Sequence, residues 1–189
     1  MKSNEVIKAI HENAVAHGWW EEERGFGEIA ALIHSELSEA LEEYRNEKPF
    51  VYYAGFDAFG RKLEEAHPIK PYIVKPEGIA VELADTVIRV LDYFGKIGYT
   101  VEELSASNPE TDDVDEAPYQ NFGDFVANCH ADVSAAYDDM NGERNLYLCD
   151  CCARIERWFR RNGLDLEEVI AIKNEYNKSR PYRHGGKKC

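Results

Sequence analysis

The sequence predicts an all-α fold, and three observations favour it. Apolar residues recur every three to four positions over several long segments, which is the period of an amphipathic helix. No segment alternates with period two over any length, as a half-buried strand would. Glycine or proline stands at the expected ends of these segments. We therefore expect a single all-α domain over residues 1–189, a length sufficient for one hydrophobic core.

The first half begins with two predicted helices. The first covers residues 4–17 and ends at Gly18, and the second covers residues 27–46 and ends before Pro49. The second has the clearer apolar stripe, with acids along its edge. The stripe consists of Ile29, Ile33, Leu37, Ala40, Leu41 and Tyr44.

An irregular excursion is expected over residues 50–76, which are rich in aromatic residues, Gly and Pro. One short helical turn is expected at 62–66, and the segment as a whole is a candidate wall for a ligand pocket. A strong helix follows over 77–97, with Pro76 suited to its start and Gly98 to its C-terminal cap.

The second half contains an acidic loop or linker at 105–118 and then three further predicted helices. These helices cover residues 121–140, 145–162 and 166–178. By role, residues 1–98 carry the candidate metal-binding helices, residues 99–162 an inserted pair of helices, and residues 163–189 the final helix with a basic tail.

Composition excludes several classes of function. A formal net charge of −14 argues against nucleic acid as the main partner, because phosphate binding needs clustered Lys and Arg. No apolar run approaches the roughly 20 residues that span a membrane, and the N-terminus lacks a signal-peptide core. We expect a cytoplasmic protein whose five cysteines stay reduced, namely Cys129, Cys149, Cys151, Cys152 and Cys189.

Two pairs of acids carry the strongest chemical signal. Glu36 and Glu39 are three residues apart on one predicted helix, and Glu82 and Asp85 repeat this spacing on another. Residues at i and i+3 share a helix face, so two packed helices would bring four carboxylates together. Such a cluster needs cations, and Mg²⁺ prefers hard oxygen ligands. The competing interpretation is that paired acids form an ordinary solvated helix face.

A cationic counterpart lies near the C-terminus. Lys173, Asn177, Arg180 and Arg183 have the side chains that hold phosphate oxygens, Arg by paired hydrogen bonds. An acidic metal centre with a cationic clamp suggests cleavage of a phosphate ester or anhydride. The alternative is that the basic tail is only a solubilising end.

A weak internal repeat is also present. Residues 130–139 echo residues 34–43, and residues 163–169 echo residues 98–104. Duplication would leave the second copy with fewer acids, because Ala135 matches Glu39. The second half would then be a degenerate partner of the first, unless the likeness reflects only shared helical composition.

Taken together, three blocks of the chain resemble the MazG-like nucleotide pyrophosphohydrolases, which belong with the dimeric dUTPases in an all-α superfamily. The blocks are residues 31–43, with the acids of the first pair, residues 75–89, with those of the second, and residues 176–187 in the tail. The resemblance covers roughly residues 5–98 and 163–188. It implies a MazG-like helical bundle.

The resemblance also implies a reaction. It is Mg²⁺-dependent cleavage between the α- and β-phosphates of a nucleoside triphosphate, with Mn²⁺ as a possible substitute. By motif position Glu36, Glu39, Glu82 and Asp85 look like metal ligands, and Lys173, Asn177 and Arg180 like phosphate contacts. Ser35 stands where the family pattern has an acid, which leaves Glu43 or a water on the metal to direct the attack.

Alternatives remain open at this point. The chain could be a nucleotide-binding regulatory domain without catalysis on the same fold. A di-iron bundle would need Glu-x-x-His pairs, and only Glu64 with His67 has that spacing, directly before Pro68. A homodimer is expected, although the internal repeat could replace the partner subunit. The sequence names neither the base nor the modified nucleotide that is preferred.

Overall fold

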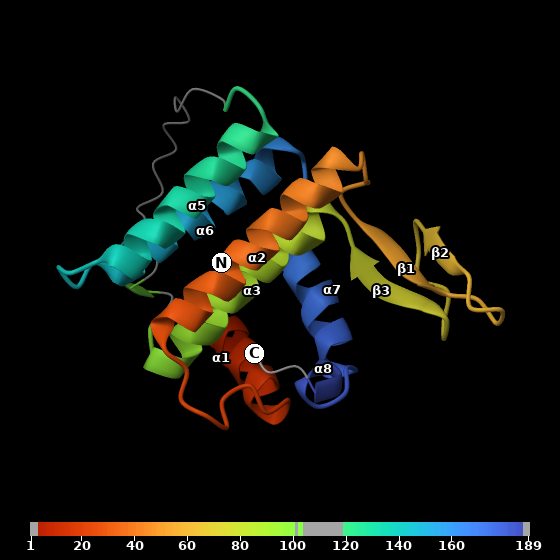
Figure 1. The fold of residues 1–189 in the computed structure, drawn as a ribbon, viewed down its shortest axis with the longest axis horizontal. Helices are drawn as coiled ribbons and strands as arrows, with labels where there is room; N and C mark the ends of the chain where they lie inside the picture. The colour runs from red at the N-terminus through yellow and green to blue at the C-terminus, as the bar shows by residue number, and fades with distance from the viewer. Residues whose placement is uncertain (1–3, 101, 104–118, 187–189) are drawn as a thin grey trace.

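The computed structural model describes residues 4–100, 102–103 and 119–186. Most of them are helical, as expected, and the helices begin and end close to the predicted limits (Figure 1). The expected loop 105–118 lies outside the described residues. The elements in chain order are α1 (Asn4–Ala16), α2 (Phe26–Arg45), β1 (Tyr52–Phe56), β2 (Lys62–Glu65), β3 (Ile73–Glu77), α3 (Ile79–Ile97), α5 (Phe122–Asp138), α6 (Arg144–Arg161), α7 (Leu166–Lys178) and α8 (Arg183–Gly186).

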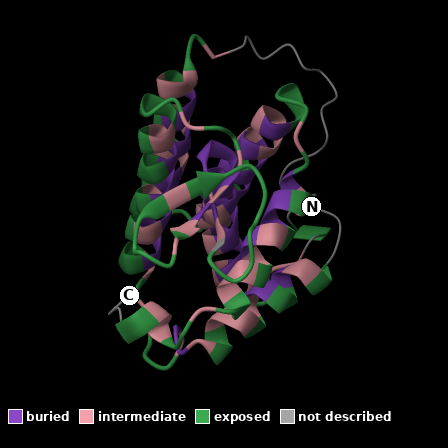
Figure 2. Ribbon diagram, turned by 90° about the vertical axis from the view of Figure 1, so that its right-hand side faces the viewer, coloured by how far each residue is buried: buried purple, intermediate pink, exposed green. Residues whose placement is uncertain are grey.

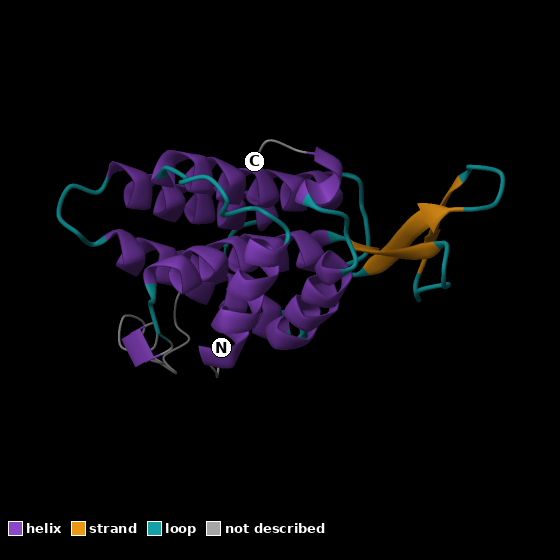
Figure 3. Ribbon diagram, turned by 90° about the horizontal axis from the view of Figure 1, so that it is seen from below, coloured by secondary structure: helices purple, strands orange, loops and turns teal. Residues whose placement is uncertain are grey.

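The sheet corrects the all-α prediction. Three antiparallel strands in the order β2-β1-β3 occupy the segment expected to be irregular, and β2 stands where a helical turn was expected. The sheet projects from one end of the helical body (Figure 3). Its strands are four or five residues long and only partly buried. Strands this short have too few residues for an alternation of apolar and polar positions to be visible in the sequence. The sheet also covers little of the core, so few of its positions need an apolar residue.

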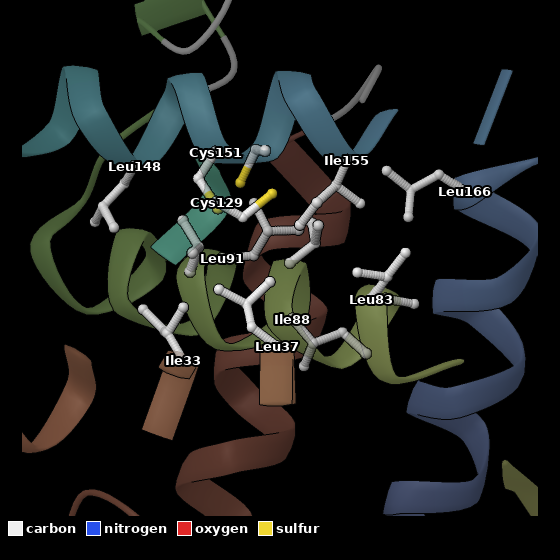
Figure 4. Packing of buried hydrophobic residues seen from close by; sticks show 14 of the residues in the cluster. Ile33, Leu37, Leu83, Ile88, Leu91, Cys129, Leu148, Cys151, Ile155 and Leu166 are labelled. Carbon is white, nitrogen blue, oxygen red and sulfur yellow. The ribbon is translucent and has the colours of Figure 1, made fainter. Parts of the chain in front are cut away.

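The core is organised around α3. This helix packs against α2, α1, α7 and α6. Figure 2 shows that the buried residues lie in the interior of the helical body, and Figure 4 shows several buried side chains of α3 among them. Leu83, Val87 and Leu91 have no exposed surface. No helix in the described ranges is both long and apolar enough to cross a membrane.

A glycine fixes where α3 begins. Gly78 has φ +118°, and a Cβ atom there would lie 2.6 Å from the carbonyl oxygens of Pro49 and Phe50. The amide of Ala80 donates to that Phe50 oxygen at 2.9 Å, so the start of α3 lies directly against the segment that precedes β1. The helix starts at Ile79 rather than at residue 77, and Glu82 falls in its first turn.

Helices α2 and α3 form a first helical pair, and α5 and α6 form a second pair that packs beside it. α5 lies against α2, and α6 contacts α3. Cys129, Cys149, Cys151 and Cys152 are buried in this half and form no disulfide with one another, whereas Cys189 lies outside the described residues. Figure 4 shows Cys129 and Cys151 within the core.

Contacts recur at matching positions of the two helical pairs. Arg89 of α3 pairs with Glu36 of α2 at 3.0 Å, and Arg154 of α6 pairs with Asp132 of α5 at 2.9 Å. The aromatic contact between Phe26 and Tyr93 recurs between Phe122 and Trp158. Left-handed glycines, Gly98 and Gly163, end α3 and follow α6. The two pairs therefore share local structure as well as helix order.

One contact joins matching residues directly. His34 of α2 and His130 of α5 stack with ring centroids 5.0 Å apart, and their Nδ1 atoms are 2.7 Å apart. Burial lowers the pKa of both rings, which favours a neutral pair in which one Nδ1 donates to the other. The contact joins positions that match in the two echoing segments of the sequence, residues 34–43 and 130–139.

Candidate metal centre

A polar cavity of about 220 Å³ opens between the first helical pair, α2 and α3, and helix α7. Its walls come from α1, α2, α3 and α7, with Lys75 of β3 at one edge. The acids that line it lie on the two central helices, and most of the basic and amide groups on the surrounding elements. The lining residues are Ile10, Asn13, Ala14, His17, Trp19, Leu32, Ser35, Glu36, Glu39, Lys75, Glu82, Asp85, Ile88, Arg89, Asp92, Lys173, Asn174, Asn177, Arg180 and His184.

Three carboxylates converge in this cavity. One oxygen each from Glu36, Glu82 and Asp85 lies within 4.8 Å of the others. Glu36 and Glu82 are only 7% and 6% exposed. Side-by-side packing of α2 and α3 produces the cluster, because the acids stand on the facing edges of both helices. Hard oxygen donors at this spacing fit a small divalent cation.

Burial and mutual repulsion disturb the titration of these acids. Burial raises the pKa of Glu82 to about 8, and the charges of Asp85, Glu36 and Glu39 add to the rise while Lys173 opposes it. Burial also raises the pKa of Glu36, and Asp85 contributes in the same direction. Two acids that resist ionisation in the absence of a cation are the expected signature of a site that binds one.

Two basic side chains already neutralise part of the cluster. Lys173 Nζ lies 2.7 Å from Asp85 Oδ2, with only 4% of the lysine side chain exposed. Arg89 donates from Nε and from its terminal nitrogen to the same oxygen of Glu36, Oε1, at 3.0 Å. Burial alone would lower the pKa of Lys173, but the neighbouring acids outweigh it and the pKa is raised. The lysine therefore stays charged inside the cavity.

The expected phosphate contacts share one wall of the cavity. Lys173 and Asn177 are a turn apart on α7, and Arg180 follows just beyond its end. The Asn177 Oδ1 atom is buried without a hydrogen-bond partner in the described structure. The carbonyl of Arg180 is tied to His17 Nε2 at 3.0 Å, which holds this part of the chain against the end of α1.

The structure separates the remaining predicted site residues. Glu39 lines the cavity and accepts a hydrogen bond from Ser35 at 3.2 Å, but it stands outside the close group of three acids. Glu43 is not among the described residues that line the cavity; it lies by Tyr52 at the base of the sheet, and burial raises its pKa.

The side chain of Arg183 points away from the cluster formed by Glu36, Glu82 and Asp85. Its guanidinium donates to the Gly18 carbonyl at 3.3 Å and approaches Glu21 at 3.4 Å, beside the turn that follows α1. Its backbone amide also donates to the His17 carbonyl, which fixes the tail there. His184 lines the cavity and packs edge-on against Trp19.

Several residues that line the cavity were not predicted from the sequence to be site residues. Arg89 carried a signal, because it follows Asp85 by four residues and Glu82 by seven on the same helix face. Asn13, His17 and Asn174 had none, because only the tertiary packing of α1 beside α7 brings them here. From the aromatic segment 50–76, Lys75 is the one described residue that lines the cavity.

Asp92 also lines the cavity, but its carboxylate is already engaged. It accepts from Trp20 Nε1 at 2.8 Å and pairs with His11 Nδ1 at 2.7 Å. Asp92 therefore anchors α1, whereas Glu36, Glu82 and Asp85 form the close group that could hold a cation. The di-iron alternative loses its motif, because Glu64 lies in strand β2 rather than on a helix and pairs with Lys48.

Comparison with known proteins adds no family to this geometry. No family model matches the chain, and no significant match is found among curated proteins or solved structures.

Proposed function

We propose that this protein is a Mg²⁺-dependent nucleoside triphosphate pyrophosphohydrolase with a MazG-like arrangement of its metal helices. The observation that carries the proposal is the convergence of Glu36, Glu82 and Asp85 in one cavity whose opposite wall holds Lys173 and Arg180. Acids on one side and cations on the other match a metal–triphosphate complex, which presents a cation and anionic oxygens together. The Asn177 Oδ1 atom, buried without a partner in the described structure, is an acceptor that a cation or a donor group would satisfy, and the amide nitrogen of the same side chain is the group that could donate to a phosphate oxygen.

The residues divide the work in this proposal. Glu36, Glu82 and Asp85 hold the cation, and Arg180 and Asn177 orient the phosphate chain. When bound, Mg²⁺ supplies charge neutralisation and polarisation of the phosphoanhydride. Glu39, held by Ser35 at the edge of the acid cluster, accepts the proton of the attacking water. Water adds to the α-phosphorus, the bond to the bridging oxygen breaks, and pyrophosphate leaves with the nucleoside monophosphate as the second product.

Pyrophosphate release tests this proposal directly. The protein is incubated with Mg²⁺ or Mn²⁺ and a panel of canonical, deoxy and modified nucleoside triphosphates, and products are separated by anion exchange. Asp85→Asn is expected to abolish release. Glu42→Gln, which changes a solvent-exposed acid on α2 that pairs with Arg45, is the matched control and is expected to leave release intact. No pyrophosphate from any nucleotide would contradict the enzymatic proposal.

A regulatory nucleotide-binding domain is the second candidate. It is favoured by the observation that Lys173 and Arg89 already balance two of the acids without a metal. Binding of a nucleotide without any turnover in the same panel selects it. Release of pyrophosphate at catalytic turnover excludes it.

We also infer that the two helical pairs arose by duplication. The recurring Arg–acid pair, the recurring aromatic pair and the contact between His34 and His130 support this inference. The second pair has Tyr147 where the first has Glu82, and Ala135 where the first has Glu39. It therefore keeps the fold of a partner subunit but not the acids of a second metal centre, and one centre per chain is expected.

A further inference from the structure

We propose that Lys173 is a tethered stand-in for the metal ion, which a divalent cation displaces and which then turns to the phosphates. The inference rests on the proposed function and adds a means of coupling metal binding to nucleotide binding. Its basis is the position of the ammonium group, which lies 2.7 Å from Asp85 Oδ2 inside the acid cluster.

The ammonium and a metal ion compete for the same oxygens. Asp85 belongs to the group of three acids within 4.8 Å of one another, so a cation shared by them would lie close to the ammonium group that contacts Asp85 Oδ2. A single positive charge and a divalent ion at such separation repel each other strongly in a buried setting. This repulsion favours movement of Lys173 away from Asp85 when the cation binds.

Lys173, rather than Arg89, is the group that moves. Arg89 binds through two nitrogens to one oxygen of Glu36, a rigid arrangement that leaves the second oxygen available. Lys173 holds Asp85 through a single flexible ammonium group. One turn further along α7, Asn177 Oδ1 is buried without a partner in the described structure, and residues at i and i+4 share a helix face. The displaced ammonium has an acceptor there, on the wall where phosphates are proposed to lie.

This arrangement predicts opposite effects of one substitution on two ligands. Without Lys173 the acids bind a metal ion more tightly, because their competitor is gone. With metal present, a nucleoside triphosphate binds less tightly, because one phosphate contact is missing. A lysine with a purely structural role predicts no gain in metal affinity.

The experiment measures Mn²⁺ binding by electron paramagnetic resonance in the absence of nucleotide. Lys173→Met is expected to bind Mn²⁺ at least about tenfold more tightly than the unaltered protein, because a nearby positive charge that repels the ion is lost. Lys178→Met is the matched control, because it removes an exposed charge paired with Glu175 on the same helix, and no change is expected. Lys173→Gln, which keeps a hydrogen-bond donor without the charge, covers the case in which Lys173→Met fails to fold.

Two further readings sharpen the result. Lys173→Met is expected to melt at a lower temperature than the unaltered protein without metal and to gain more from added Mg²⁺, because the ion replaces the missing charge. In the presence of metal, its affinity for a non-hydrolysable α,β-imido nucleoside triphosphate is expected to fall by about tenfold, the usual effect of losing one charged contact.

The outcomes separate the two proposals. Mn²⁺ affinity that is unchanged or weaker in both Lys173 variants, with binding lost in Glu82→Gln, overturns the stand-in role and leaves the metal centre in place. Absence of Mn²⁺ binding in every variant overturns the metal centre, and the proposed function and the stand-in role fall with it.

Discussion

At the scale of single residues, Glu82 is the group that most separates this centre from an ordinary acidic surface. It is 6% exposed and sits in the first turn of α3, where a neighbouring lysine only partly offsets burial and three other acids. An exposed acid would ionise freely and tolerate the absence of a cation. Glu82 does neither, which makes its titration a direct probe of the site.

The raised pKa of Glu82 predicts how stability changes with pH. Its pKa of about 8 in the folded protein compares with 4.5 in the unfolded chain. Between these values the folded state holds a proton that the unfolded state has lost, so raising the pH destabilises the metal-free protein. The effect is on the order of 4 kcal/mol over the window. Denaturant unfolding with a chelator from pH 5 to 8.5 measures it, and Glu82→Gln is expected to flatten the curve.

The control for this measurement is Glu42→Gln, whose exposed side chain lies outside the cavity. Its curve is expected to follow that of the unaltered protein. Added Mg²⁺ is expected to stabilise the unaltered protein more at pH 8 than at pH 6, because the ion needs the ionised carboxylate. A flat response to pH in the unaltered protein would contradict the assignment.

Glu39 and Glu43 have different expected roles although both stand on α2. Glu39→Gln is expected to lower pyrophosphate release by about 10²-fold or more, as loss of a general base does. Glu43→Gln is expected to retain release, because Glu43 lies by Tyr52 at the base of the sheet. Turnover measured at saturating nucleotide distinguishes the two variants. Equal losses of turnover in both would contradict the role of Glu39 as the general base.

At the scale of elements, the start of α3 decides whether the acids meet. Gly78→Ala is expected to destabilise the fold by about 2 kcal/mol, because its Cβ would lie 2.6 Å from two carbonyl oxygens and its φ is +118°. The displaced first turn carries Glu82, so weaker Mn²⁺ binding is expected as well. Gly60→Ala is the matched control, with φ +75° and nothing within 4 Å of the new Cβ. It is expected to leave Mn²⁺ binding unchanged.

Much of this element structure could be predicted from the sequence, for physical reasons. The long helices carry enough apolar turns for their period to stand out, and α7 spans the same residues as predicted. The short strands β1 to β3 carry no such pattern, because each has only four or five residues and its pairing depends on residues outside the strand itself. The spacing predicted that Glu36, Glu39, Glu82 and Asp85 meet, and the structure brings three of them, without Glu39, into one close group. The place of Glu43 could not be predicted, because the fold of the sheet at the end of α2 determines it.

At the scale of the whole molecule, the two helical pairs contain similar contacts and differ in their acids. The pair formed by Asp132 and Arg154 stands where Glu36 and Arg89 stand in the first half. Arg154 also donates to the Tyr119 hydroxyl at 2.6 Å, and its hydrogen bonds to Asp132 and Tyr119 raise its pKa despite burial. This half therefore holds a balanced ion pair.

Matched substitutions in the two halves test this difference. Asp132→Asn is expected to destabilise the protein by about 2 kcal/mol, because it leaves a partly buried guanidinium without its charge partner. Its Mn²⁺ affinity is expected to equal that of the unaltered protein. Glu36→Gln is expected to weaken Mn²⁺ binding. Calorimetric titration is also expected to give one Mn²⁺ per chain, and a second site of similar affinity lost in Asp132→Asn would contradict the division of roles.

The packing of α2 against α5 has a consequence for dilution. Two helical pairs that associate as separate chains come apart when their concentration falls below the dissociation constant. Here both pairs belong to one chain, and the effective concentration of one for the other is set by the connection between them, which for tethered units reaches roughly millimolar. The interface beside the acid cluster therefore persists at the low copy numbers at which a separate partner would be lost.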